Sequence, residues 1–137
     1  MPSGLEIIRS VMGGEGERRP FDPDTLRRNA EENWDPEIVY EEAPDWPGAG
    51  TFRGREAILA RLDEYTDVLG DMETEVEEYV PDGEDRALVI FRAYARSVAG
   101  VPVERRWGYL FTVRDSKLVH WRAEMDPDRV RRELAPG

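Results

Sequence analysis

Residue types that could do acid-base or metal chemistry are unevenly represented in this sequence. Asp and Glu together number 30, histidine occurs once, at His120, and cysteine is absent. A dedicated zinc site takes several His or Cys ligands, so a lone histidine predicts no such site. The acidic run is typical of a solvated strand edge and comprises Glu73, Glu75, Glu77 and Glu78. We therefore expect no metal and no cofactor.

Two Asp-Pro-Asp triplets begin at Asp22 and Asp126. Aspartate is a favoured N-cap and proline is favoured in the first helical turn, so both triplets predict helix starts rather than metal ligands. The glycines at 48, 50 and 54 also precede a helix, but they follow a proline-bearing loop and lack the dinucleotide-binding spacing. The sequence thus predicts no phosphate-binding loop.

The charge balance bounds the possible partners. A net charge of −11 repels nucleic acid phosphates and anionic lipid surfaces, so we expect neither nucleic-acid nor membrane binding. No apolar run approaches the roughly 20 residues of a membrane span, and we expect no secretory signal. The absence of cysteine suits a reducing compartment, which predicts a cytoplasmic protein.

Hydrophobic periodicity predicts an α+β domain spanning residues 1–137. The spacing indicates helices over 5–12, 22–33, 54–69 and from 126 onward. Strands are predicted at 38–42, 72–80, 87–97, 103–114 and 117–125, and the last four form an antiparallel meander because short turns join them.

Alternation along the predicted strands groups large aromatic side chains. Trp107 and Tyr109 share one side of their strand, and Trp121 faces the same way from the next strand. We expect these rings to lie under the helices and to line a pocket, with Tyr65 from the helix over 54–69. Trp46, in the loop over 44–50, is expected to help seal it.

The order of elements and several segments resemble a known family. These segments are WDPEIVYE at 34–41, TFRGREAI at 51–58, WGYLFTVRD at 107–115 and KLVHWR at 117–122. They resemble the SnoaL-like branch of the nuclear transport factor two superfamily over nearly the whole chain. The resemblance implies a cystatin-like α+β cone, in which a mixed or antiparallel sheet curls around the long helix. Because this family includes polyketide cyclases, epoxide hydrolases, ketosteroid isomerases and ligand binders, the resemblance does not imply one reaction.

The resemblance also implies which positions face the pocket. Carried over to this chain, they are Tyr40, Glu42, Arg92, Tyr94, Tyr109 and Ala123. Related hydrolases hold a water with an Arg-x-Asp pair, a Tyr-x-Asn pair and an Asp on the last strand. Here Tyr94, Glu42 and Ala123 stand where those mechanisms need Asp, Asn and Asp. The departure at Ala123 argues against both the cyclase and the hydrolase reaction.

Glu42 is the carboxylate expected on the pocket face, beside Tyr40 and within reach of Arg92. An aromatic enclosure raises the pKa of a carboxyl group and a guanidinium lowers it, so Glu42 could act as a base near neutral pH. The structural alternative is that Glu42 only pairs with Arg92 or points to water. Glu124 or Asp126 replaces it as the pocket acid only if the strand register slips by one residue.

The other polar candidates each have two interpretations. Arg92 either recognises an anionic or carbonyl oxygen of a ligand or makes a structural ion pair. Tyr40, Tyr94 and Tyr109 either donate hydrogen bonds to a developing enolate or belong to the core. Alternation places His120 on the face away from the pocket.

Three functions follow from these residues. The first is a binding pocket for an apolar or polycyclic small molecule. The second is a cofactor-independent isomerase or cyclase, with Glu42 as acid/base and tyrosines plus Arg92 as oxyanion donors. The third is a non-catalytic dimerisation module.

The resemblance also implies a homodimer through the outer face of the sheet. Four apolar residues are expected to form an exposed patch there, namely Phe91, Ala93, Leu110 and Leu118. A monomer would leave such a patch in contact with water.

Overall fold

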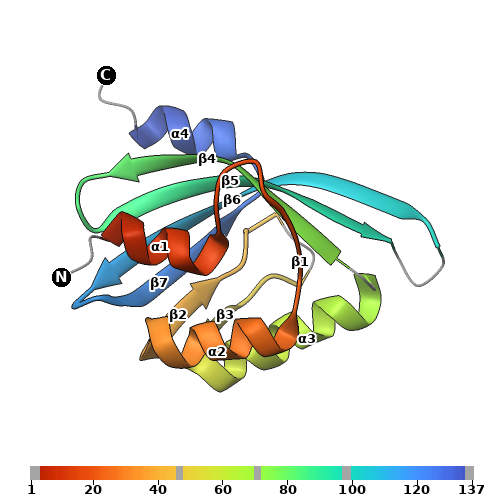
Figure 1. Ribbon diagram of the computed structural model, residues 1–137, viewed down its shortest axis with the longest axis horizontal. Coiled ribbons are helices and arrows are strands. Elements are labelled where there is room, and N and C mark those ends of the chain that lie inside the picture. Colours follow the sequence, from red (N-terminus) through yellow and green to blue (C-terminus); the bar gives the residue numbers. More distant parts are fainter. Residues whose placement is uncertain (1–3, 46–47, 70–71, 97–99, 135–137) are drawn as a thin grey trace.

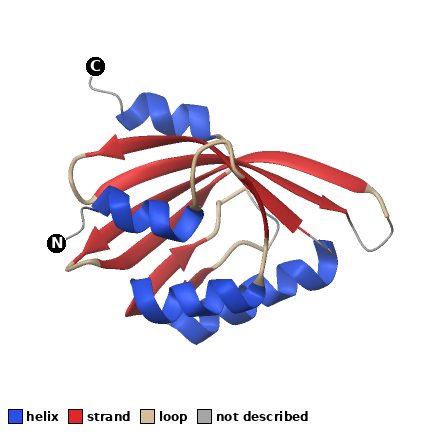
Figure 2. Ribbon diagram, in the orientation of Figure 1, coloured by secondary structure: helices blue, strands red, loops and turns tan. Residues whose placement is uncertain are grey.

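The computed structural model describes residues 4–45, 48–69, 72–96 and 100–134. It is an α+β fold in which a curved sheet carries helices on both faces (Figures 1 and 2). In chain order the elements are α1 (Gly4–Met12), β1 (Arg18–Pro20), α2 (Pro23–Asn33), β2 (Trp34–Glu41), β3 (Thr51–Arg53), α3 (Arg55–Leu69), β4 (Met72–Asp82), β5 (Arg86–Arg96), β6 (Pro102–Arg114), β7 (Lys117–Glu124) and α4 (Pro127–Leu134).

The sheet has seven strands in the order β1-β4-β5-β6-β7-β2-β3. The predicted antiparallel meander is confirmed for β4 to β7, whereas β2 pairs parallel with β7 and antiparallel with β3. The sheet is therefore mixed. The sequence pattern does not predict β1 and β3, because three residues are too few for a period of two to be recognised.

Both Asp-Pro-Asp triplets begin helices, as predicted. Asp22 accepts hydrogen bonds from the backbone N–H of Asp24 at 3.1 Å and from the Thr25 hydroxyl at 2.7 Å. Asp126 accepts one from the backbone N–H of Arg129 at 3.1 Å. These bonds satisfy donors that an uncapped helix leaves without partners. None of the helices in the described ranges is long and apolar enough to cross a membrane.

Apolar side chains are buried on both faces of the sheet. We call the face packed against α1, α2 and α3 the inner face, and its buried side chains, which include Ile8, Ile58 and Phe111, the inner cluster. We call the other the outer face, where Leu88 and Ile90, together with Leu110, pack against Val130 of α4. Figure 1 shows α4 on the opposite side of the sheet from α2 and α3.

The two apolar faces explain why the sequence assigned β5 to the wrong side. Ala87, Val89 and Phe91 belong to the inner cluster, while Leu88 and Ile90 lie under α4. Because both sets are apolar, alternation alone does not identify the inner set. Residues one or three positions away from Phe91 on this strand therefore face outward.

The expected apolar patch on the outer face is likewise not formed. Phe91, Ala93 and Leu118 pack with the inner cluster. Only Leu110 lies on the outer face, and α4 covers it. A register shift between Thr112 and Val113, in the pairing of β6 with β7, accompanies the inward position of Leu118.

Candidate functional site

A cavity of about 260 Å³ lies on the inner face, between the sheet, β1 and helices α2 and α3. Most of its lining is apolar or aromatic. Of the aromatic residues expected to face the ligand, Tyr65, Trp107, Tyr109 and Trp121 line it. Trp46 lies outside the described residues, and Tyr94 lies on the outer face.

Trp121 is the centre of an aromatic cluster in the wall of this cavity. Its ring centroid lies 4.4 Å from that of Tyr40 and 5.0 Å from that of Tyr109. Trp34 and Phe111 follow, each at 5.6 Å. Such tilted and edge-to-face pairs stabilise the wall beyond simple burial, by roughly 0.5–1.5 kcal/mol each. These rings therefore hold one another in place in the cavity wall.

Two tyrosine hydroxyls remain protonated in this wall. Burial raises the pKa of Tyr40 far above its ordinary value, and the nearby Tyr109 and Glu42 raise it further. Burial also raises the pKa of Tyr109, with a further contribution from the charge of Glu42. Both groups thus keep their protons at any physiological pH and can donate hydrogen bonds to a bound molecule.

Two further donors in the wall are buried without a partner among the described residues. They are the indole N–H groups of Trp34 and Trp121. A buried donor left unsatisfied costs about 1–3 kcal/mol. A bound water or an oxygen of a ligand within reach would remove this cost.

Glu42 lines the cavity, as expected, but its charge is already matched. Arg61 of α3 donates to it from Nε and from Nη2, each at 2.9 Å, and the backbone N–H of Gly50 adds a third bond at 3.0 Å. The Glu42 side chain is 1% exposed and that of Arg61 is 21% exposed. Hydrogen bonding to Glu42, and then to Glu64, raises the pKa of Arg61. The guanidinium that meets Glu42 is therefore that of Arg61 and not that of Arg92.

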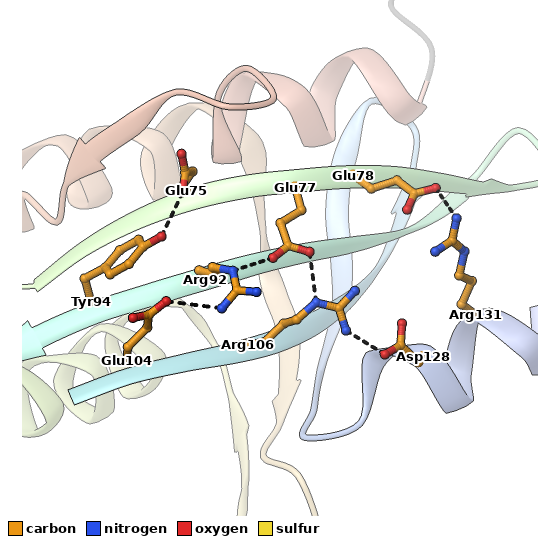
Figure 3. Close-up of polar contacts among 9 residues, drawn as sticks. All are labelled: Glu75, Glu77, Glu78, Arg92, Tyr94, Glu104, Arg106, Asp128 and Arg131. Atoms are coloured by element: carbon orange, nitrogen blue, oxygen red, sulfur yellow. Dashed lines mark hydrogen bonds and ion pairs between the residues drawn. The ribbon is translucent and has the colours of Figure 1, made fainter.

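Arg92 lies on the outer face, where Figure 3 shows it among other charged side chains. Its guanidinium pairs with Glu77 at 2.7 Å and with Glu104 at 3.2 Å. Glu77 also pairs with Arg106, which reaches Asp128 of α4. Of the two readings of Arg92, the structural ion pair is the one that this geometry supports.

Tyr94 also lies on the outer face and not in the cavity. Its hydroxyl donates to Glu75 at 2.8 Å (Figure 3), and this bond raises the pKa of Tyr94. The Arg18 guanidinium lies 3.7 Å from the centre of its ring. Tyr94 is thus occupied by neighbours on its own face.

A bulge in β4 explains how so many charges meet on the outer face. The pairing of β4 with β5 shifts between Val76 and Glu78, which leaves Glu77 as the extra residue. Glu77 and Glu78 both reach arginines on the outer face, Glu78 through Arg131 of α4. A bulge lets two successive side chains share one face. These acids therefore lie across a sheet face, in ion pairs, and not along a solvated edge.

The alternative pocket acids are placed elsewhere. Glu124 pairs with Arg122 and Arg129, away from the cavity, and Asp126 caps α4. Ala123 lines the cavity and is buried. The register therefore has not slipped, and the position that carries the acid in the resembled enzymes holds a methyl group.

His120 does not line the cavity. Its Nε2 contacts the carboxylate of Glu41 on the neighbouring strand β2. Across the described part of the chain, no three His, Asp or Glu side chains are grouped closely enough to hold a metal ion.

Sequence reasoning missed the role of Arg61, although a signal was present. Arg61 precedes Tyr65 by four residues on α3, so both side chains lie on one helix face. Its guanidinium lies 5.3 Å from the ring centres of Tyr65 and of Phe52. Helical spacing alone could have placed Arg61 near the pocket rim.

Solved structures with this fold come from several bacteria. A nuclear transport factor two-like protein from Burkholderia thailandensis is 17% identical, with 99% of this chain and 100% of that chain covered and a TM-score of 0.75. A putative SnoaL-like polyketide cyclase from Jannaschia is 20% identical, with 83% and 82% covered and a TM-score of 0.65. A Mycobacterium tuberculosis protein in complex with estradiol-17β-hemisuccinate is 18% identical, with 73% and 81% covered and a TM-score of 0.61.

At these identities the structural likeness establishes the fold alone. Among curated proteins, none matches this chain. A family model of the SnoaL-like domain matches residues 22–121, which is well over half of the chain. The chain belongs to the SnoaL-like domain family.

Proposed function

We propose that this SnoaL-like domain binds an apolar, ring-bearing small molecule in its inner cavity. The observation that carries the proposal is the cavity of about 260 Å³ with its aromatic wall around Trp121. Small-molecule sites are mostly apolar clefts of roughly 300–1,000 Å³ with a few polar groups that fix orientation, and this cavity lies just below that range, which favours a small ligand. The protonated hydroxyls of Tyr40 and Tyr109 are suitable polar groups. The steroid derivative held by the Mycobacterium tuberculosis protein is compatible with a ring-shaped ligand.

A neutral fluorescent probe tests this proposal. N-Phenyl-1-naphthylamine is apolar and bright only out of water, so wild-type protein should give a saturable signal with one site per chain. Ala93 lines the cavity, and Ala93→Trp should fill it and abolish the signal. Ala93→Ser keeps the space and serves as the matched control. A wild type that fails to bind, or an Ala93→Trp variant that binds normally while folded by circular dichroism, would contradict the proposal.

Acid-base catalysis by Glu42 is the second candidate, because Glu42 is the buried carboxylate of the described cavity wall. Its bonds to Arg61 and Gly50 occupy three of the roughly four acceptor positions of a carboxylate, which leaves one position on Oε2 that can take a proton from a substrate. Compounds that raise the melting temperature can be followed by mass spectrometry for chemical change. Turnover that survives in Glu42→Gln would exclude Glu42 as the acid/base.

Homodimerisation through the outer face is a third proposal, which now depends on charged rather than apolar contacts. The apolar residues expected to drive it do not form a patch, so contacts would involve the charged residues around Arg92 and Arg106. Light scattering at micromolar concentration measures the mass directly. A dimer that becomes monomeric when Arg92 is replaced by Glu would support this face, and a monomeric wild type would exclude it.

A further inference from the structure

One charged side chain of the described cavity lining has neither an ion pair nor a side-chain hydrogen bond. Arg105 of β6 lines the cavity and is exposed. Its guanidinium lies 5.5 Å from the ring centre of Trp107, two residues along the strand. Within residues 4–45, 48–69, 72–96 and 100–134, no carboxylate forms an ion pair with Arg105. Its charge is therefore available to a bound molecule.

The other charged residues of the described lining have partners. Glu42 is held by Arg61, and Asp22 caps α2 through its two oxygens. The Nε of Arg19 lies 3.8 Å from the Oε1 of Glu17. The charge of the cavity left without a partner is thus positive, in a chain whose net charge is −11.

Burial along β6 shows that Arg105 stands at the mouth of the cavity. On the inner face of this strand, Val103 is 38% exposed and Phe111 is 1% exposed. Trp107 and Tyr109, which lie between them, are half-buried. A molecule entering along this strand meets Val103 and Arg105 before it reaches the aromatic wall.

Small neighbours leave room beside Arg105. The strand register aligns Arg19, Thr74, Ala93 and Arg105 in one row across β1, β4, β5 and β6. Adjacent strands lie about 4.8 Å apart, so Ala93 and Thr74 are the first and second neighbours of Arg105. Both line the cavity. A polar group of a ligand can therefore rest over these small side chains within reach of the guanidinium.

We propose that the ligand carries an anionic group, of the carboxylate or sulfonate kind, on its apolar ring body, and that Arg105 binds this group at the mouth. The inference rests on the proposed binding function and names the class of ligand. A planar guanidinium matches such oxygens with two parallel hydrogen bonds. At an exposed mouth the pair forms without the large desolvation cost of a buried ion pair. A local cation is also needed there, because the overall negative charge repels anions.

Two dyes with the same ring system test the anionic preference. 8-Anilinonaphthalene-1-sulfonate is N-phenyl-1-naphthylamine with an added sulfonate, and both fluoresce when removed from water. Wild-type protein should bind the sulfonate more tightly. Arg105→Met should weaken sulfonate binding about tenfold while changing the affinity for the neutral dye less than twofold. Arg105→Lys should retain part of the preference, because it keeps the charge but not the fork of donors.

Arg114 provides a matched control on the same strand. It is exposed, lies at the other end of β6 and does not line the cavity, so Arg114→Met removes one positive charge elsewhere. This variant should bind both dyes as the wild type does. Added salt should weaken sulfonate binding in the wild type and leave it nearly unchanged in Arg105→Met.

The outcomes separate the inference from the proposed function. If the neutral dye binds the cavity but Arg105→Met affects both dyes equally, the anionic ligand class is wrong and the binding function stands. If Arg114→Met weakens sulfonate binding as much as Arg105→Met, the effect is one of net charge and the role of Arg105 is overturned. If neither dye binds, both proposals fail.

Discussion

The carboxylate of Glu42 and the guanidinium of Arg61 form a two-pronged ion pair, with both hydrogen bonds at 2.9 Å. Gly50 binds the same carboxylate through its N–H and also accepts a hydrogen bond from the Glu42 backbone at 3.0 Å. The pair therefore joins three segments, which are the end of β2, the chain before β3, and α3. It fixes one side of the cavity.

Removing Arg61 should be more harmful than removing the charge of Glu42. Arg61→Met leaves a nearly fully buried carboxylate with one N–H donor, and we expect a loss of roughly 3 kcal/mol in unfolding free energy. Glu42→Gln should lose less, because the partly exposed Arg61 retains Glu64 and water. Urea unfolding at pH 7 measures both changes.

An exposed ion pair provides the control for this comparison. Arg27 and Glu56 join α2 to α3 at 3.2 Å with both side chains exposed. Arg27→Met should cost less than about 1 kcal/mol. If Arg61→Met costs no more than Arg27→Met, the buried pair does not stabilise the cavity rim.

The free energy of unfolding should fall above pH 10, because Tyr79 loses its stabilising effect there. Burial raises the pKa of Tyr79 to about 12, and its hydroxyl donates to the backbone oxygen of Gly13. An unfolded tyrosine loses its proton near pH 10, so between about pH 10 and 12 the unfolded chain binds fewer protons than the folded one. The raised pKa of Tyr79 therefore adds to the free energy of unfolding below pH 10. This contribution is lost as the pH rises towards 12, by up to about 1.4 kcal/mol per pH unit.

Urea unfolding at several pH values, together with phenolate absorbance, measures this effect. Tyr79→Phe should be less stable near pH 8, since it lacks the bond to Gly13, yet its stability should fall less steeply above pH 10. The difference in slope should correspond to about one proton. Equal slopes for the two proteins would show that Tyr79 does not titrate on unfolding.

The sequence predicted the positions of helices and strands better than the face of the sheet on which a side chain lies, and β5 shows why. Helix caps such as Asp22 and the long strands follow from local chemistry, which neighbours along the chain determine. The face of Arg92 depends on whether helix α4 covers Leu88 and Ile90, which is a tertiary fact. A strand that is apolar on both faces carries no local signal for its inner side.

The same reasoning separates the site residues. Trp107, Tyr109 and Trp121 were placed correctly because their own strands alternate between large rings and polar or small residues. The partner of Glu42 could not be found from strand alternation, because Arg61 comes from a helix and meets Glu42 only after α3 packs on β2. Residue spacing within one element predicts a shared face, whereas contacts between elements need the fold.

Arg92 should have no effect on ligand binding. Arg92→Gln removes the ion pairs with Glu77 and Glu104 on the outer face, and because the Arg92 side chain is 41% exposed the loss should be below about 1 kcal/mol. The affinity for either naphthylamine dye should stay within twofold of the wild type. A tenfold loss of affinity with unchanged stability would return Arg92 to the binding site.

The absence of a side chain at Gly108 should be essential for the packing of α4 on the sheet. A Cβ added at this position of β6 would lie 2.9 Å from the Cβ of Pro127 and 3.2 Å from the Cδ1 of Leu88. Gly108→Ala must therefore push α4 away from the outer cluster, and we expect a loss of about 1–3 kcal/mol. Thermal unfolding should show a lower midpoint.

Gly14 provides the control for this substitution. It is exposed, and a Cβ there meets only the flexible carboxylate of Glu17, at 3.3 Å. Gly14→Ala should change stability by less than about 0.5 kcal/mol.

The cavity lies on the other face, so Gly108→Ala should still bind the neutral dye with one site per chain. A Gly108→Ala protein as stable as the wild type would mean that α4 does not rest on β6 at this point, whereas loss of dye binding by a folded variant would mean that the two faces are coupled.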